Sequence, residues 1–172
     1  MEEEIQARRK AIHSMSNQWE EWQKAGASKY VVNVLKEGVR VEPSEDLKPF
    51  NGKVSLSKWE EDQVKWFHKE IHILKEIGAL EPCKDPVIVS KYRLVPKRDS
   101  FRLIIDMRPL NKYCTIRKFK YKTLRKFLEF VPRDTEEEIY GSTFDMKSGY
   151  HQVKIHPDCR KYFAIQVGEE TL

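Results

Sequence analysis

Apolar side chains recur at helical spacing near the start of the chain and predict two helices there. Residues 5–24 repeat apolar side chains on roughly one face, and Gly26 is the expected stop. A shorter helix is expected over residues 29–37, with Gly38 at its C-terminal end. Residues 42–56 carry two prolines, an Asn-Gly pair and several charges, which predict a linker or long loop.

The strongest helical pattern begins at Ser57. Ser57 and Glu60 match a capping box, in which each side chain bonds a backbone amide at the start of a helix. Apolar residues then follow at helical spacing as far as Gly78, which is expected to cap the end. His68 and His72 lie four residues apart on this helix. Neither has the adjacent glutamate of the zinc protease motifs, so the pattern disfavours a metal site here.

Alternating polar and apolar positions predict a β-hairpin in the middle of the chain. Residues 87–96 and 101–105 are the expected strands, and the polar stretch 97–100 is the expected turn. Basic side chains at such a tip can hold phosphate groups, and arginine can do so with two parallel hydrogen bonds. A solvated turn explains the same composition equally well. The basic residues are Arg93, Lys97, Arg98 and Arg102.

A second basic stretch follows the hairpin. Residues 112–122 interleave lysine and arginine with tyrosine and phenylalanine, a mixture that suits contact with a nucleic-acid strand. Residues 123–130 are predicted to be helical, with Leu124, Phe127 and Leu128 facing inward. An acidic loop is expected after this helix.

The stretch from Phe144 to Lys154 is predicted to form a strand, a turn and a second strand. Asp145 would then lie at the end of the first strand, beside a turn at Ser148 and Gly149. A hard divalent cation needs carboxylate oxygen and can add a backbone carbonyl from the next residue. Capping of the turn by the Asp145 carboxylate is the structural alternative. A further strand is expected over residues 162–167.

Composition and charge narrow the classes of protein that fit. A chain of 172 residues is long enough for one domain, or one domain with an extension. The net charge of +5 permits a nucleic-acid partner without requiring one. Three widely spaced cysteines without a Cys-x-x-Cys pair favour reduced thiols, and hence an intracellular protein of the cytoplasm or nucleus. No signal peptide and no membrane span is expected.

Four motifs, taken in order, resemble the N-terminal half of a reverse transcriptase, an RNA-directed DNA polymerase, of the gypsy and DIRS type of retrotransposon. The similar stretch runs from about Ile77 to the end of the chain. The resemblance implies an α+β fold in residues 57–172, namely the fingers and the first part of the palm of a right-hand polymerase. Residues 1–56 would be an N-terminal helical extension and linker. The motifs are Gly78-Ala-Leu-Glu-Pro82, Leu94-Val-Pro-Lys97, Phe101-Arg-Leu-Ile-Ile-Asp-Met-Arg-Pro-Leu-Asn111 and Phe144-Asp-Met-Lys-Ser-Gly-Tyr-His-Gln-Val153.

The resemblance also implies roles for matching residues. Asp145 matches the first catalytic aspartate, a ligand of both Mg²⁺ ions of a two-metal site, and Met146 would add its backbone carbonyl to one of them. The remaining matches concern the deoxynucleoside triphosphate and the RNA or DNA template–primer. Lys97 and Arg102 match residues that hold the β- and γ-phosphates, Gly149 and Tyr150 match the triphosphate and sugar contacts, and Arg108 and Asn111 match template contacts.

The chain departs from the family in its second acidic motif, because no Asp-Asp pair occurs anywhere in it. One carboxylate and one carbonyl cannot hold two magnesium ions against water, so we expect the chain alone not to polymerise DNA. It would then be a fragment that a continuation or a second chain completes. Two alternatives stay open: a module that binds nucleic acid without chemistry, and an interaction protein that docks a partner through its N-terminal helices. A sheet cut after its first strands should also leave the chain marginally stable.

Overall fold

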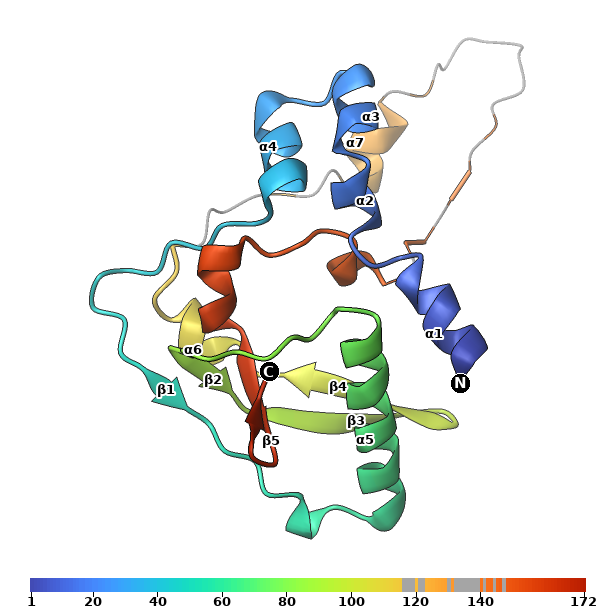
Figure 1. The fold of residues 1–172 in the computed structure, drawn as a ribbon. Coiled ribbons are helices and arrows are strands. Elements are labelled where there is room, and N and C mark those ends of the chain that lie inside the picture. The colour runs from blue at the N-terminus through green and yellow to red at the C-terminus, as the bar shows by residue number, and fades with distance from the viewer. Residues whose placement is uncertain are drawn as a thin grey trace. The chain divides into compact units, whose positions relative to one another are not determined.

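The computed structural model describes a mixed fold of α-helices and β-strands (Figure 1). The chain divides into two compact units, one of residues 1–115 with 148–172 and one of residues 116–147. No helix of the described part is long and apolar enough to cross a membrane. The described residues are 1–115, 120, 123–129, 131, 140, 142–143, 145–146 and 148–172, with the side chain of Phe127 excepted.

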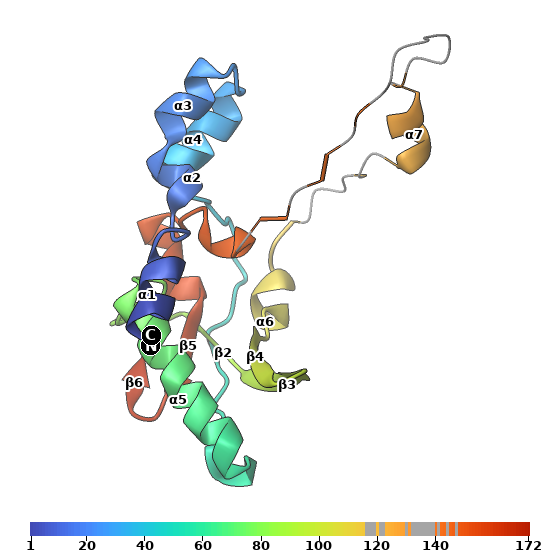
Figure 2. The same ribbon diagram turned by 90° about the vertical axis from the view of Figure 1, so that its right-hand side faces the viewer.

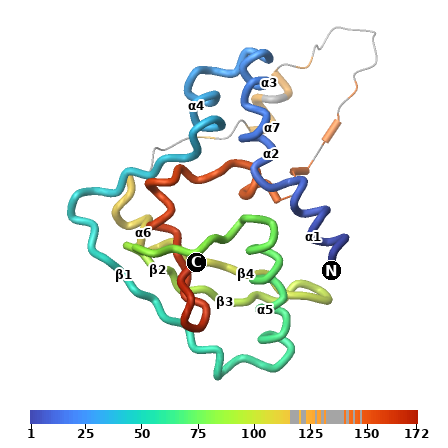
Figure 3. Tube along the Cα trace, viewed as in Figure 1, coloured from blue at the N-terminus to red at the C-terminus, as the bar shows by residue number. Residues whose placement is uncertain are grey.

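A four-stranded sheet joins distant parts of the first unit in the order β1-β2-β5-β6. Its strands β1, β2 and β5 run parallel, and β6 returns antiparallel to β5. All three residues of β2 are buried, as expected for a strand with a parallel neighbour on each side. Figure 3 shows the C-terminal segment returning to lie beside β2. The strands are β1 (Phe50–Asn51), β2 (Ile88–Ser90), β5 (Ala164–Val167) and β6 (Glu170–Thr171).

The predicted hairpin is present as β3 (Tyr92–Lys97) and β4 (Ser100–Ile105), joined by a two-residue loop. Arg98 in that loop has a φ of 39°, the left-handed conformation that tight hairpin turns require. The prediction of one strand over residues 87–96 was wrong. The chain leaves the four-stranded sheet after β2 and enters a separate two-stranded sheet at β3, because β2 is bonded on both sides by β1 and β5.

The core of the first unit lies where helix α5 (Glu61–Glu76) packs on the hairpin and on β5 (Figures 1 and 3). Phe67 of α5 is fully buried and stacks on Tyr92, with 4.9 Å between the ring centroids. Ile165 and Leu172 complete the cluster. Leu172 exchanges two main-chain hydrogen bonds with Ile165, so the last residue of the chain extends the β5–β6 pairing.

Helix α5 begins later than its sequence pattern predicted. Its N-cap is Glu60, whose backbone N–H donates to the Gln63 side chain at 3.1 Å, and the capping box predicted at Ser57 was wrong. Leu56–Lys58 form a short 3-10 helix, η1, instead. Trp59 is extended and sets its indole edge-on against Phe67, 5.3 Å between centroids. The ring is partly buried against the core cluster, and the backbone at Trp59 is extended where the helix was predicted.

The single helix predicted over residues 5–24 was also wrong. The chain forms α1 (Glu2–Arg9), α2 (Ser14–Asn17) and α3 (Trp19–Lys24). The break lies at His13, which has a left-handed φ of 54° and donates its N–H to the His151 carbonyl at 2.7 Å. A tertiary hydrogen bond therefore replaces the helical one. The helix expected over residues 29–37 is confirmed as α4 (Lys29–Glu37) and ends at Gly38.

Helix α1 lies beside the C-terminal half of α5 (Figures 1 and 2). Ile5 is buried in a second cluster with Ile73, Leu74 and Ile77. Arg8 grips the Glu70 carboxylate with two hydrogen bonds of 2.8 and 2.7 Å, which raises the pKa of the guanidinium. Together with β1 in the sheet, these contacts place parts of residues 1–56 within the first unit.

The strand, turn and strand predicted from Phe144 to Lys154 are not formed by the described residues of that stretch. Asp145 and Met146 have no regular structure, and Gly149–His151 form a 3-10 helix, η2. Ile155 makes only an isolated parallel bridge to Val39. A longer 3-10 helix, η3 (Pro157–Tyr162), then precedes β5, so the strand predicted over residues 162–167 is confirmed in its C-terminal part.

The second unit contains α7 (Leu124–Leu128), which confirms a helix in the predicted region. Its leucines do not face inward, because Leu124 is 74% exposed and Leu128 is 50% exposed. Most of the basic and aromatic stretch lies outside the described residues, as does the acidic loop. The residues of the basic stretch concerned are Arg117, Lys118, Phe119, Tyr121 and Lys122.

Candidate nucleic-acid interface

One face of the hairpin carries a row of basic side chains. Val95 pairs with Arg102 and Lys97 pairs with Ser100, so Lys97 and Arg102 lie on the same face as diagonal neighbours. Diagonal pairs of this kind are about 7–8 Å apart at the backbone, within reach of each other for long side chains. Arg93 continues the same face from its place opposite Ile104. The side chains of Arg93, Lys97 and Arg102 are exposed.

The other face of the hairpin fixes this orientation. Leu94, Leu103 and Ile105 pack against the core cluster beneath α5. Phe101 meets Trp66 of α5 edge-on, with 5.9 Å between centroids. Because side chains alternate along each strand, burial of one face turns the basic residues of the other face to solvent.

Helix α6 (Arg108–Asn111) follows directly after β4 and adds an arginine held in a fixed position. Arg108 donates from Nε and Nη2 to the two Asp106 carboxylate oxygens at 2.8 and 2.7 Å. The Asp106 carboxylate also accepts from the Arg108 backbone N–H at 3.1 Å. These hydrogen bonds lower the pKa of Asp106 to about 2. The Arg108 side chain is 88% exposed, and its remaining donors are open to solvent.

A hollow of about 770 Å³ connects α6 to the hairpin. Arg93, Arg108 and Asn111 line it together with Asp106. Lys91 lies at its edge, two positions before Arg93 and so on the same side of the chain. We call this continuous surface the basic face. Its basic residues are Lys91, Arg93, Lys97, Arg102 and Arg108.

The charge of the basic face is nearly unopposed along its own segment. Residues 91–108 contain two carboxylates, Asp99 in the hairpin turn and Asp106. The Asp106 carboxylate is engaged by Arg108 and lies within electrostatic reach of Arg93. The surface can therefore accept anionic groups such as phosphates.

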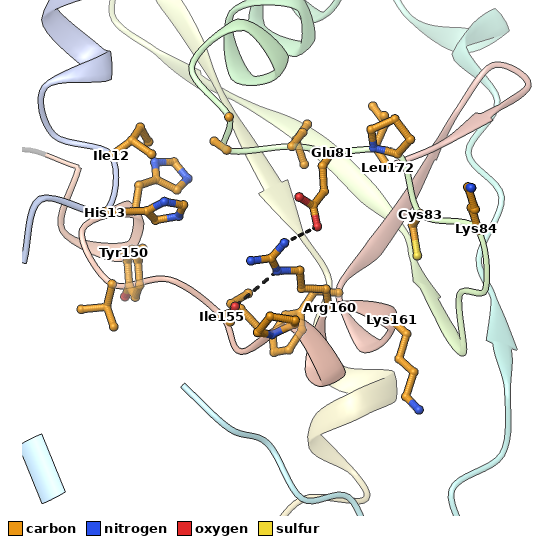
Figure 4. Close-up of a pocket in the computed structure, with 18 of the residues that line it drawn as sticks. Ile12, His13, Glu81, Cys83, Lys84, Tyr150, Ile155, Arg160, Lys161 and Leu172 are labelled. Carbon is orange, nitrogen blue, oxygen red and sulfur yellow. Dashed lines mark hydrogen bonds and ion pairs between the residues drawn. The ribbon is translucent and has the colours of Figure 1, made fainter. Parts of the chain in front are cut away.

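The other predicted nucleotide-binding residues, Gly149 and Tyr150, belong to η2. Tyr150 lines a different hollow, and its side chain is wholly exposed at the rim. This second hollow measures about 420 Å³ and is lined by both apolar and charged side chains. Figure 4 shows Arg160 in it, with its guanidinium donating to the Glu81 carboxylate at 2.6 Å and the Ile155 carbonyl at 3.3 Å.

Asp145 and Met146 belong to the second unit and are exposed. Among the described residues, no three histidine, cysteine or acidic side chains gather as metal ligands. One carboxylate and one carbonyl are too few for two hexacoordinate magnesium ions. The magnesium site therefore stays a prediction from the resemblance, and no chemical step is derived through it here.

The sequence analysis grouped Arg93, Lys97 and Arg102 with Arg98 at the basic hairpin tip and assigned Arg108 separately to the template, but it did not join the two sets into one surface. Lys91 and Asp106 were given no role. The signal was available in part, because Lys91, Arg93 and Lys97 are spaced by even numbers of residues and a strand puts such positions on one face. The chain matches no known protein-family model.

Proposed function

We propose that this chain is the fingers and first part of the palm of a retrotransposon-type reverse transcriptase, and that its basic face holds nucleic-acid or nucleotide phosphates. The observation that supports the proposal is the shared exposed face of Lys97 and Arg102, the two residues that the resemblance assigns to phosphate binding.

Each part of the basic face has a distinct task in this proposal. Lys97 and Arg102 bind the β- and γ-phosphates of a deoxynucleoside triphosphate, lysine as a point charge and arginine with paired hydrogen bonds. Arg108 and Asn111 contact the template strand. The Asp106 carboxylate supports this role because it fixes two nitrogens of Arg108 and so reduces the entropy lost when the guanidinium binds a phosphate.

Catalysis would need more than this chain. Asp145 and the Met146 carbonyl would supply one side of a magnesium pair, and a continuation of the chain or a second chain would supply the missing acidic pair. Gly149 and Tyr150 would then approach the triphosphate and the sugar of the incoming nucleotide. The 172-residue chain by itself would bind nucleic acid and leave a primer unextended.

A binding module without chemistry is the second candidate function. It is favoured by the same basic face, which is complete without Asp145. In this alternative the chain holds RNA or a template–primer duplex and requires no metal. The two candidates differ in the role of Asp145: in the polymerase fragment it is needed for synthesis once the rest of a palm is provided, and in the binding module it has no catalytic role.

The binding part of the proposal can be tested by fluorescence anisotropy with a labelled RNA–DNA hybrid over a series of salt concentrations. Affinity should fall as salt rises, because lysine and arginine release counterions from the phosphates. In the double variant Lys97→Ala, Arg102→Ala, the slope of log K against log salt should shrink by about 2, close to one for each lost phosphate contact.

The matched control removes the same charge elsewhere. Lys24→Ala with Lys29→Ala deletes two exposed lysines of α3 and α4 and should leave the slope nearly unchanged. If the salt slope falls equally in the two double variants, the change reflects net charge alone, and the proposed role of the basic face is refuted. Binding that ignores salt would refute phosphate contact altogether.

Primer extension separates the two candidates. With magnesium, template–primer and nucleotides, the purified chain should give no product. Templated synthesis that disappears in Asp145→Ala would contradict the prediction that the chain is inactive alone. If a second chain that carries an Asp-Asp strand restores synthesis, and Asp145→Asn abolishes it again, the fragment is supported over the module.

A further inference from the structure

The segment around His13 and the segment around His151 meet at a junction made of main-chain hydrogen bonds. The His13 N–H donates to the His151 carbonyl at 2.7 Å, and the Ser16 N–H donates to the Gln152 carbonyl at 3.3 Å. The Lys154 N–H in turn donates to Ser16 Oγ at 3.1 Å. Ser16 is only 1% exposed, so these polar groups have little access to water if their partners move away.

This junction fixes the end of α1 and therefore the docking of that helix on α5. In the docked state Ile5 covers Ile73, Leu74 and Ile77. The polar contacts are the Arg8–Glu70 pair, the Glu4–Lys69 ion pair at 3.1 Å and a hydrogen bond of 2.8 Å from Arg9 to the Glu76 carbonyl. A helix of eight residues is not stable by itself in water, so α1 depends on these tertiary contacts. If the junction opened, helix α1 would be held only by its contacts with α5.

Cations surround the two imidazoles of the junction. Burial lowers the pKa of His13 most, and Lys154, Arg160 and His151 lower it further, against an opposing effect of Glu81. Burial also lowers the pKa of His151, as does Arg8, with Glu70 opposing. Burial is the largest cause of the lowered pKa at both histidines, so both imidazoles contribute to the response to acid. His13 also donates the main-chain hydrogen bond of the junction from its left-handed backbone.

We propose that this junction is an acid-sensitive latch, closed while His13 and His151 are neutral and opened by their protonation, which releases α1 and uncovers Ile73, Leu74 and Ile77. Protonation would add two positive charges to a site already flanked by Arg8, Lys154 and Arg160. The two nearby carboxylates, Glu81 and Glu70, are already paired with Arg160 and Arg8, so they are poorly available to neutralise the new charges. The latch does not depend on the proposed polymerase relationship.

The direction of the pH effect follows from linkage. The folded-state pKa of each histidine lies below its ordinary value of about 6.5, so the open state binds more protons at mildly acidic pH. The stabilising contribution is fully present above about pH 6.5 and is lost as pH falls through the folded-state pKa. Between about pH 7.5 and pH 5.5, each histidine can raise the opening equilibrium by up to about tenfold.

Hydrogen–deuterium exchange of the full chain, read by mass spectrometry over residues 1–17, measures this opening. Protection, corrected for the intrinsic exchange rate at each pH, should fall by several-fold to about tenfold between about pH 7.5 and pH 5.5. His13→Asn should reduce that fall, because it deletes one of the two titrating imidazoles. Asparagine tolerates the left-handed backbone of this position, so the variant deletes the titrating group while it keeps the turn.

The matched control replaces two exposed histidines of α5, as His68→Gln with His72→Gln, and should retain the full pH effect. Proton NMR titration of the wild-type imidazoles gives a readout that does not depend on the folding of any variant. His13 should titrate below its ordinary pKa of about 6.5. The latch is refuted if His13 titrates at or above that value, if protection is independent of pH, or if His13→Asn leaves the pH effect unchanged.

Discussion

Gly38 lies directly against the main chain of the segment that precedes η3. Its φ is +102°, and a Cβ at this position would lie 2.6 Å from the His156 backbone nitrogen and 2.9 Å from the Ile155 carbonyl carbon. Two main-chain hydrogen bonds join the same two segments of the chain. The Val39 N–H donates to the Lys154 carbonyl at 2.9 Å, and the His156 N–H donates to the Val39 carbonyl at 3.0 Å. Gly38→Ala should therefore push these two segments apart.

The size of the effect can be worked out against Gly26→Ala. Gly26 also has a positive φ, +83°, but a Cβ there would meet nothing within 4 Å. Gly26→Ala incurs left-handed backbone strain of about 1–2 kcal/mol. Gly38→Ala incurs at least as much, because its φ of 102° with a ψ of 162° lies in a region that is essentially restricted to glycine. Both variants reduce the entropy of the unfolded chain equally. Gly38→Ala additionally loses two main-chain hydrogen bonds of about 1 kcal/mol each. We therefore expect it to be less stable than Gly26→Ala by at least about 2 kcal/mol.

Urea unfolding of the three proteins, followed by circular dichroism and by tryptophan fluorescence, gives the free energies of unfolding. The comparison is valid where the two probes give coincident transitions and the m-values agree. A difference of less than about 0.5 kcal/mol between Gly38→Ala and Gly26→Ala would be within the ordinary scatter of surface substitutions. That result would refute the close approach of Gly38 to His156.

Two further substitutions test the core and the site. Phe67→Ala should lower the free energy of unfolding by about 3–5 kcal/mol, because it empties a fully buried position between Trp59 and Tyr92. As a control in the same urea titration, Leu128→Ala should lower it far less, because Leu128 is half-exposed. Arg108→Ala should raise the pKa of Asp106 from about 2 toward 3.8, read from the carboxyl carbon by NMR. In the wild type, the contribution of this contact to stability is present above about pH 4 and is lost as pH falls through about 2. If the pKa of Asp106 does not change in Arg108→Ala, the charge-assisted pair is refuted.

Local signals in the sequence predicted the elements whose determinants are also local. Helix α4 has its expected bounds, because Ser28 caps its start with a hydrogen bond to the Val31 N–H and Gly38 ends it. The β3–β4 hairpin follows from alternating side chains around a short polar turn. The grouping of Lys97 and Arg102 on one face follows from strand period alone once the register is known.

Contacts between distant residues overruled local preference elsewhere. The helix expected over residues 5–24 is broken where the His13 N–H bonds the His151 carbonyl. Helix α5 starts after Trp59, whose partly buried ring packs edge-on against the distant Tyr92, with 6.1 Å between centroids. The predicted strand over residues 87–96 is divided because β2 has parallel neighbours on both sides. In each case, a hydrogen bond or ring contact with a remote segment outweighs helix or strand propensities of less than about 1 kcal/mol per residue.

The amino-acid sequence is enough to tell which residues are basic, which positions alternate, and which stretches can form a helix or a hairpin. Packing of distant segments is what joins the face of Arg93, Lys97 and Arg102 to the hollow of Arg108 and Asn111, and what places Tyr150 at another hollow. It also brings two distant histidines, His13 and His151, together. The physical reason is that residues far apart in the chain acquire a common surface only when burial of their opposite faces fixes how the segments pack.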